Sequence, residues 1–273
     1  MMQSPSILGL FTAFGSMRWL SIWRRNYGVW HKQMAGSLVS HIAEPLIALL
    51  AFGYGLGTLV GNVQTPLGTV PYFVFVASGL ICMSTMNSAS FEALYSAYSR
   101  LDHQKTWHGI LNAAVTIDDV VLGEVMWAAF KGTFAASIIL IVMLGLLLAG
   151  GHAITWHFVF VIPVLALVAL CFSCMGMIFT ALAKGYDFFA FYMTLFLTPM
   201  MFMAGGFFPR EQLPAVARAV TEYLPLTAAV NLVRPLFLGY APNHIAVYVG
   251  VLIVTSLVTF GIATHLVRQR FAQ

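Results

Sequence analysis

Residues 100–131 read RLDHQKTWHGILNAAVTIDDVVLGEVMWAAFK, and in this segment an otherwise apolar sequence becomes polar. The segment holds seven charged residues, which are Arg100, Asp102, Lys105, Asp118, Asp119, Glu124 and Lys131. Long uncharged runs that suit a lipid bilayer lie on both sides of it. We therefore interpret residues 100–124 as a water-facing connection between two pairs of membrane helices, large enough to contact another protein.

Two local patterns within this connection predict helices. Thr116 offers a hydroxyl to the first free N–H groups of a helix, and Asp118 and Asp119 follow it at the positive end of the helix dipole. Before them, four apolar side chains are spaced as one face of a short amphipathic helix: Trp107, Ile110, Leu111 and Ala114. Such a face could dock into a groove on a partner protein.

The composition excludes a soluble domain and gives no sign of an enzyme. Of the 273 residues, 60% are apolar and 8% are charged, whereas soluble proteins carry about 25% charged residues. The apolar runs contain neither paired carboxylates nor a nucleophile with a base, and the histidines and cysteines form no metal-ligand pattern. The chain also lacks the Gly-x-x-x-x-Gly-Lys-Ser/Thr loop that binds phosphates, so transport driven by ATP would need a separate ATPase.

The lengths of the uncharged runs predict six membrane spans. Runs of 47 and 52 uncharged residues end at Glu92 and Lys184, and each is long enough for two spans of about 20 residues. Shorter runs towards the C-terminus supply two more. The predicted spans are residues 39–59, 72–91, 125–149, 158–182, 188–208 and 244–266, with polar outer turns at 61–66 and 150–157. Pro199 and the pair Gly205 and Gly206 predict that the fifth span is kinked or broken.

The basic residues predict the orientation of the chain. Residues 11–34 alternate aromatic and basic side chains as an amphipathic helix on the cytoplasmic membrane surface would. With both termini inside, ten lysines and arginines lie on the cytoplasmic side and three on the outer side. No cleavable signal peptide is recognisable, so we expect the first span to be retained.

Residues 210–239 are too long for a turn and too apolar for a free loop. The sequence predicts two helices that dip into the outer leaflet, broken at Leu224-Pro225, the second running from Thr227 to Arg234 and ending before Pro235. Arg234 would then be a cation at membrane depth, which is costly unless paired. It is either a functional residue or an arginine whose side chain snorkels to the membrane–water interface. Glu44, in the first turn of span one, is the acid nearest to mid-membrane.

Four motifs together resemble a known family. They are Glu44-Pro45, residues 118–124 (DDVVLGE), residues 199–209 (PMMFMAGGFFP), and residues 224–227 (LPLT) followed by Arg234 and Gly239. Over essentially its whole length the chain resembles the ABC-2 type permeases, the membrane subunits of ABC exporters. Within that family it is most similar to the NodJ-type nodulation permeases, which export lipo-oligosaccharides together with a NodI-type ATPase.

The resemblance implies an all-α integral membrane domain over residues 1–273. It implies an interfacial N-terminal helix, six spans, a cytoplasmic coupling helix between spans two and three, and a re-entrant helix pair before span six. It further implies a homodimer in a bacterial inner membrane with two NodI-type ATPase subunits, which bind the ATP and Mg; no cofactor is expected in this chain. Coupling to the ATPase is carried onto Trp107, His108, Ile110, Leu111, Ala114, Asp118 and Asp119, and the gate or substrate path onto Glu44, Pro199, Gly205, Gly206 and Arg234.

These expectations favour an ATP-driven exporter that moves a lipo-oligosaccharide or similar amphiphilic glycolipid outward. Contacts with membrane lipid and an amphiphilic glycan are expected, and nucleic acid is not. An exporter of drugs or other small amphiphiles would have the same architecture. A membrane anchor that recruits a cytosolic protein without transporting anything is the alternative from another class.

Overall fold

The computed structural model describes residues 15–32, 34, 43, 46–66, 68–149 and 155–272. Within these residues, four helices are long and apolar enough to cross a membrane: Tyr72–His103, Ile117–Leu148, Trp156–Leu182 and Ile245–Ala272. Two shorter apolar helices, Leu46–Val60 and Phe188–Met203, accompany them. All six overlap the predicted spans, although two fall short of membrane length. Glu44, like most of residues 33–45, lies outside the described residues.

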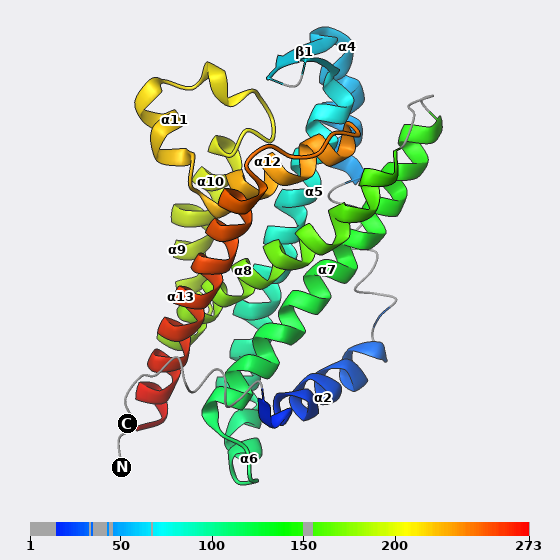
Figure 1. Cartoon of the computed structure of the whole chain (residues 1–273). Coiled ribbons are helices and arrows are strands. Elements are labelled where there is room, and N and C mark those ends of the chain that lie inside the picture. Colours follow the sequence, from blue (N-terminus) through cyan, green and yellow to red (C-terminus); the bar gives the residue numbers. More distant parts are fainter. Residues whose placement is uncertain are drawn as a thin grey trace.

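Figure 1 shows an elongated helical bundle with α6 and the C-terminus at one end and β1, α4 and α11 at the other. In chain order the elements are α2 (Trp19–His31), η1 (Leu49–Leu56), α4 (Gly57–Val60), β1 (Asn62–Thr65), β2 (Gly68–Pro71), α5 (Tyr72–Phe91), η2 (Glu92–Ser96), η3 (Ser99–His103), α6 (Thr106–Leu111), α7 (Ile117–Ala149), η4 (Trp156–Phe160), α8 (Val161–Leu182), α9 (Phe188–Tyr192), η5 (Met193–Leu197), α10 (Thr198–Met203), η6 (Arg210–Gln212), α11 (Ala215–Thr221), α12 (Pro225–Phe237) and α13 (Ile245–Ala272). Helix α8 packs against α5, α7, α12 and α13 and is the central helix of the bundle.

The inner end, which we define as the end with α6 and the C-terminus, has a longer helix α5 than the sequence predicts. Helix α5 continues through the π-helical turns η2 and η3 to His103, and α7 begins at Ile117, directly after the helix start predicted at Thr116. The connection between them is therefore shorter than residues 100–124. Arg100 and Glu124 lie on helices instead of in a water-facing loop, because ion pairs within the bundle compensate their charges.

Helix α2 packs along the inner half of α7 (Figure 1). Its residues Ile22, Asn26 and Trp30 are buried in this contact, as an amphipathic helix with one apolar face should be. A glycine is required where the helices meet, because a Cβ atom at Gly123 would lie 2.8 Å from Cβ of Ile22. The described helix is shorter than the predicted segment 11–34.

The outer end, which holds α4, α11 and the strands, contains a small β-hairpin where the sequence predicts only a turn. Strands β1 and β2 pair antiparallel, with Val63 opposite Val70. Both valines are buried, while their neighbours in each strand are mostly exposed. This alternation buries one face of the hairpin against the start of α5 and so adds a two-stranded sheet to an otherwise helical fold.

The fifth apolar run is broken near its glycine pair. Pro199 lies at the second position of α10, directly after the π-helical turn η5 and within the continuous helix Phe188–Met203, and the helix ends at Met203. Gly205 follows with a φ of 78°, a conformation that favours glycine. Gly206 lies against α5 so closely that a Cβ at Gly79 would come within 2.5 Å of the Gly206 Cα.

The outer segment consists of η6, α11 and α12, with the break at Leu224 where the sequence predicts it. The predicted end of the second helix before Pro235 is wrong, because α12 includes Pro235 and ends at Phe237. Proline removes only one hydrogen bond this close to the C-terminus of a helix, and the buried apolar side chains around it retain the last turn.

Candidate functional site

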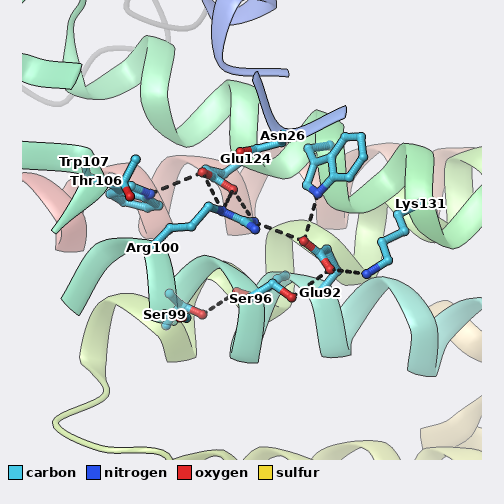
Figure 2. A network of polar contacts seen from close by, with 12 residues as sticks. Asn26, Glu92, Ser96, Ser99, Arg100, Thr106, Trp107, Glu124 and Lys131 are labelled. Atoms are coloured by element: carbon cyan, nitrogen blue, oxygen red, sulfur yellow. Dashed lines mark hydrogen bonds and ion pairs between the residues drawn. The ribbon is translucent and has the colours of Figure 1, made fainter. Parts of the chain in front are cut away.

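A buried network of ion pairs joins α5, α6 and α7 at the inner end (Figure 2). The Arg100 guanidinium donates from Nε to both carboxylate oxygens of Glu124, each at 3.0 Å, and from Nη2 to Oε2 at 2.6 Å. The same Nη2 donates to Oε1 of Glu92 at 3.1 Å. One arginine therefore binds two acids from different helices.

Glu92 is the second centre of the network. It accepts hydrogen bonds from Lys131 Nζ at 2.7 Å, from Trp127 Nε1 at 2.8 Å and from Ser96 Oγ at 2.8 Å. Glu92 and Glu124 are both buried, with exposures of 4% and 0%. Two acids and two bases balance each other, which offsets the large cost of removing each charge from water.

Trp107 connects the short helix α6 to this network. Its side chain is fully buried and its Nε1 donates to Glu124 Oε1 at 3.2 Å. Helix α6 also contacts α2, since Arg25 Nη2 donates to Thr106 Oγ1 at 3.5 Å. A displacement of α6 would therefore act directly on a charge held between α5 and α7.

The helix start predicted at Thr116 is confirmed. The Asp119 N–H donates to Thr116 Oγ1 at 3.3 Å, and the Thr116 N–H donates to Asp119 Oδ2 at 3.0 Å, which is a reciprocal capping box. Asp118 has another role, because it forms an ion pair with Arg268 near the end of α13. Arg270 donates to Asp102 at 3.0 Å, so the end of α13 is tied to both α5 and α7.

The structure separates the residues assigned to coupling into two groups. Trp107, Asp118 and Asp119 are buried within this chain, and the expectation that Trp107 faces a partner is corrected by its contact with Glu124. Ile110 and Leu111 are half-buried against the inner core, while His108 and Ala114 are exposed. His108 lies 4.7 Å from the Phe271 ring, measured between centroids. A partner could therefore reach His108, Ile110, Leu111 and Ala114, which we call the rim of α6, but not Trp107.

At the outer end, Arg234 of α12 is held by neutral groups. Nη2 donates to the carbonyl oxygens of Gly205 at 2.6 Å and Phe75 at 3.4 Å, and Nε donates to Ser78 Oγ at 3.1 Å. Its Cζ lies 3.8 Å from the centroid of the Phe75 ring, a cation–π distance. Among the described residues, none of the ion pairs includes Arg234.

The residues assigned to the gate are partly brought together. Arg234 binds Gly205 directly, and Gly206 packs on α5 at Gly79, the residue after Ser78. Pro199 lies at the start of α10, before the glycine pair in the chain. Glu44, also assigned to the gate, lies outside the described residues.

Comparisons with known proteins identify the family of this chain. A model of the family described as ABC-2 type transporter matches residues 17–238. The chain belongs to the ABC-2 type transporter family. This assignment makes the protein a multi-pass membrane permease, a class of transport subunit that is generally not itself catalytic.

The similar proteins place this ABC-2 permease beside nodulation proteins. It is 40% identical to nodulation protein J of Rhizobium leguminosarum bv. trifolii, covering 94% of this chain and 95% of the relative. It is 39% identical to nodulation protein J of Rhizobium meliloti, over 92% and 93%. The inner membrane transport permease YadH of Escherichia coli is more distant, 24% identical over 90% of this chain and 96% of the relative.

Sequence reasoning missed Glu92 and Trp127 as members of the permease's inner network. The contacts join residues 24 and 39 positions apart, which one sequence does not reveal. A signal was nevertheless present, since Glu92, Ser96 and Arg100 recur every four residues and so share one helix face. A stripe of this kind at the end of an apolar span indicates partners inside the bundle.

Proposed function

We propose that this ABC-2 permease is the membrane subunit of an exporter that moves an amphiphilic glycolipid of the lipo-oligosaccharide class outward across a bacterial inner membrane. The similarity to nodulation protein J over nearly the whole chain supports this choice. Two permease chains and two NodI-type ATPase subunits would form the complex, and the ATPase would bind ATP and Mg. Six spans, with both termini in the cytoplasm and α11 and α12 re-entering from outside, complete the proposal.

The observation that carries the coupling role is the bond between Trp107 and Glu124. Work by an ATPase on the membrane helices requires a contact whose free energy differs between two conformations. Helix α6 offers such a contact, because its rim is accessible while its tryptophan lies inside the charge network. We infer that closure of the ATPase pushes on α6 and that Glu124 passes the displacement to α5 and α7.

An exporter of small amphiphiles would share this architecture, and the substrate decides between the two. Accumulation of a glycolipid inside cells that lack the gene favours the first proposal; retention of a drug alone favours the second. The membrane-anchor alternative predicts that neither compound accumulates.

The coupling role is tested by replacing Ile110 and Leu111 together with aspartate. These side chains are half-buried at the rim of α6, so two charges should remove apolar docking contacts worth about 2 kcal/mol or more. The variant should insert normally but lose a co-expressed NodI-type ATPase on purification and export nothing. Ile110→Val with Leu111→Met is the matched control and should retain both properties.

Full export and ATPase retention by the aspartate variant would exclude α6 as the docking element. Ile110 and Leu111 also contact the inner core, so the aspartate variant could fail by unfolding. The thermal stabilities of the aspartate variant and its control are therefore compared in detergent, and the test applies when they are equal. The purified permease alone should bind no ATP. Saturable ATP binding by this chain would contradict the division of labour between permease and ATPase.

A further inference from the structure

A cavity of about 300 Å³, lined mostly by charged and polar residues, lies at the outer end beside Arg234. Its walls come from the β-hairpin, the start of α5, η6, the end of α11, α12 and the start of α13. The side chains that decide its chemistry are Arg210, Glu222, Asn231, Arg234, Asn243 and Tyr248. Elements distant in sequence thus surround a cavity at the lower end of the range of about 300–1,000 Å³ for small-ligand sites.

Arg234 retains unused donor capacity at this cavity. Its hydrogen bonds use Nε and Nη2, and no bond within the described part of the chain uses Nη1. The guanidinium is fixed in place by Phe75 and by two carbonyl oxygens. A fixed donor with free N–H groups beside a cavity is ready for an oxygen acceptor on a ligand.

The remaining walls carry opposite charges and neutral amides. Arg210 forms an ion pair with Glu222, whose other carboxylate oxygen accepts from the Tyr248 hydroxyl at 3.2 Å. Glu211 adds a second carboxylate to balance Arg234. A simple anion would be repelled by two carboxylates and a simple cation by two guanidinium groups. The site therefore suits a neutral ligand that both donates and accepts hydrogen bonds at several points.

We propose that this cavity binds one sugar residue of the exported molecule on the outer side of the membrane. A sugar ring carries several hydroxyl groups, and each can donate to a carboxylate and accept from an arginine or amide. The side-chain amides of Asn231, on α12, and Asn243, in the connection before α13, offer both functions. The proposal deepens the proposed function and rests on it for the identity of the natural ligand, while the binding itself can be measured without transport.

Saturation-transfer NMR on the purified full chain tests the site directly. The chain is placed in phosphatidylcholine nanodiscs, because detergents with sugar headgroups would compete, and is offered glucose, galactose or N-acetylglucosamine at tens of millimolar. At least one sugar should receive saturation. Asn243→Leu should weaken its binding about fivefold, the effect of losing roughly one hydrogen bond, and the double variant with Asn231→Leu should abolish the signal.

Asn62→Leu is the matched control, since Asn62 lines a neighbouring cavity of about 580 Å³ and is absent from the walls of the proposed site. It should leave sugar binding unchanged. Asn243 is exposed and makes no hydrogen bond among the described residues, so its replacement does not threaten folding.

Three results would overturn the proposal: no saturation of any sugar, saturation that survives the double variant, or displacement of the sugar by inorganic phosphate. The last result would assign the cavity to an anion. Sugar binding without glycolipid export would refute the proposed function alone, whereas export without sugar binding would refute this site alone.

Discussion

Arg100 and Arg234 are the same side chain in two different environments. Arg100 lies at the inner end between the carboxylates of Glu92 and Glu124, whereas Arg234 lies at the outer end among carbonyl oxygens, a hydroxyl and an aromatic ring. The charge of Arg100 is neutralised by carboxylates of the same chain. Arg234 is also held in a fixed orientation, but its charge is not paired with a carboxylate and its Nη1 makes no hydrogen bond among the described residues.

We expect this difference to correspond to two roles, coupling at the inner end and ligand binding at the outer end. A paired buried charge holds helices in register, and removing one partner leaves the other uncompensated. An arginine held by neutral dipoles can still attract a ligand. We therefore expect mutations at the inner end to affect stability and coupling, and mutations at the outer end to affect export and binding.

The largest effect should come from labelling that places the two ends on opposite sides of the membrane. Cysteines at Gln64 and Ala215 should react with an impermeant thiol reagent in cells with a permeabilised outer membrane, and one at Lys105 should not. The background lacks Cys82, Cys171 and Cys174, which are buried free thiols. Labelling at position 105 would reverse the orientation and with it the assignment of inner and outer ends.

Glu124→Leu should cause the largest loss of stability. It leaves Arg100 with one acid and Trp107 Nε1 without its acceptor, and breaking a buried pair costs about 3–5 kcal/mol. Tryptophan fluorescence during thermal unfolding in detergent measures the loss. Asp102→Asn, which removes the more exposed pair with Arg270, should cost at most about 1 kcal/mol. Similar losses in both variants would refute the structural importance of the network.

Arg234→Ala should reduce export with a smaller effect on stability. The variant loses three hydrogen bonds to neutral acceptors and the fixed donor at the cavity, but it leaves no buried carboxylate without its partner. Expression and ATPase association should persist, and transport of a labelled glycolipid into the outer fraction measures the defect. Normal export would show that Arg234 has no functional role and only snorkels to the membrane–water interface.

The smallest effect concerns the ion pair at the cavity wall. Burial alone would raise the pKa of Glu222, but the hydrogen bond and charge of Arg210 outweigh it, so that its pKa lies below the ordinary value. A lowered folded-state pKa contributes stability above the unfolded pKa of about 4.3, and this contribution disappears as pH falls through the folded value.

Glu222→Gln should therefore be less stable than the parent chain at pH 6, by at most about 1 kcal/mol because the carboxylate is partly exposed. The difference should shrink as the pH falls below about 4. Melting curves of both chains across this range measure it. A difference that grows with acid would have the wrong sign and would exclude the pairing.

Local signals predicted local structure well. The hydroxyl and acids at 116–119 marked the start of α7, and the second span, predicted from the uncharged run and its polar turn at 61–66, starts where α5 starts. The break at Leu224 followed from the proline after it. Each of these features depends either on neighbours within one turn of a helix or on a continuous apolar run long enough to cross the bilayer.

The rest depends on contacts between distant residues. The charges of Arg100 and Glu124 predict contact with water, yet these residues neutralise each other inside the bundle. Pro235 predicts a helix end, yet tertiary packing retains the last turn. The outer cavity gathers side chains from six separate elements, and their meeting follows from the fold rather than from any motif.

The two π-helical turns at the inner end of α5 have a mechanical consequence. Each of η2 and η3 accommodates an extra residue compared with an α-helical turn, and between them they carry Glu92 and Arg100. Rewinding one turn to α geometry would advance everything beyond it by about 1.5 Å and rotate it by about 100°. Helix α6 follows η3 directly in the chain. A push on α6 could therefore convert a π-helical turn at the inner end of α5 to α geometry, or the reverse, and so shift and rotate the residues beyond it.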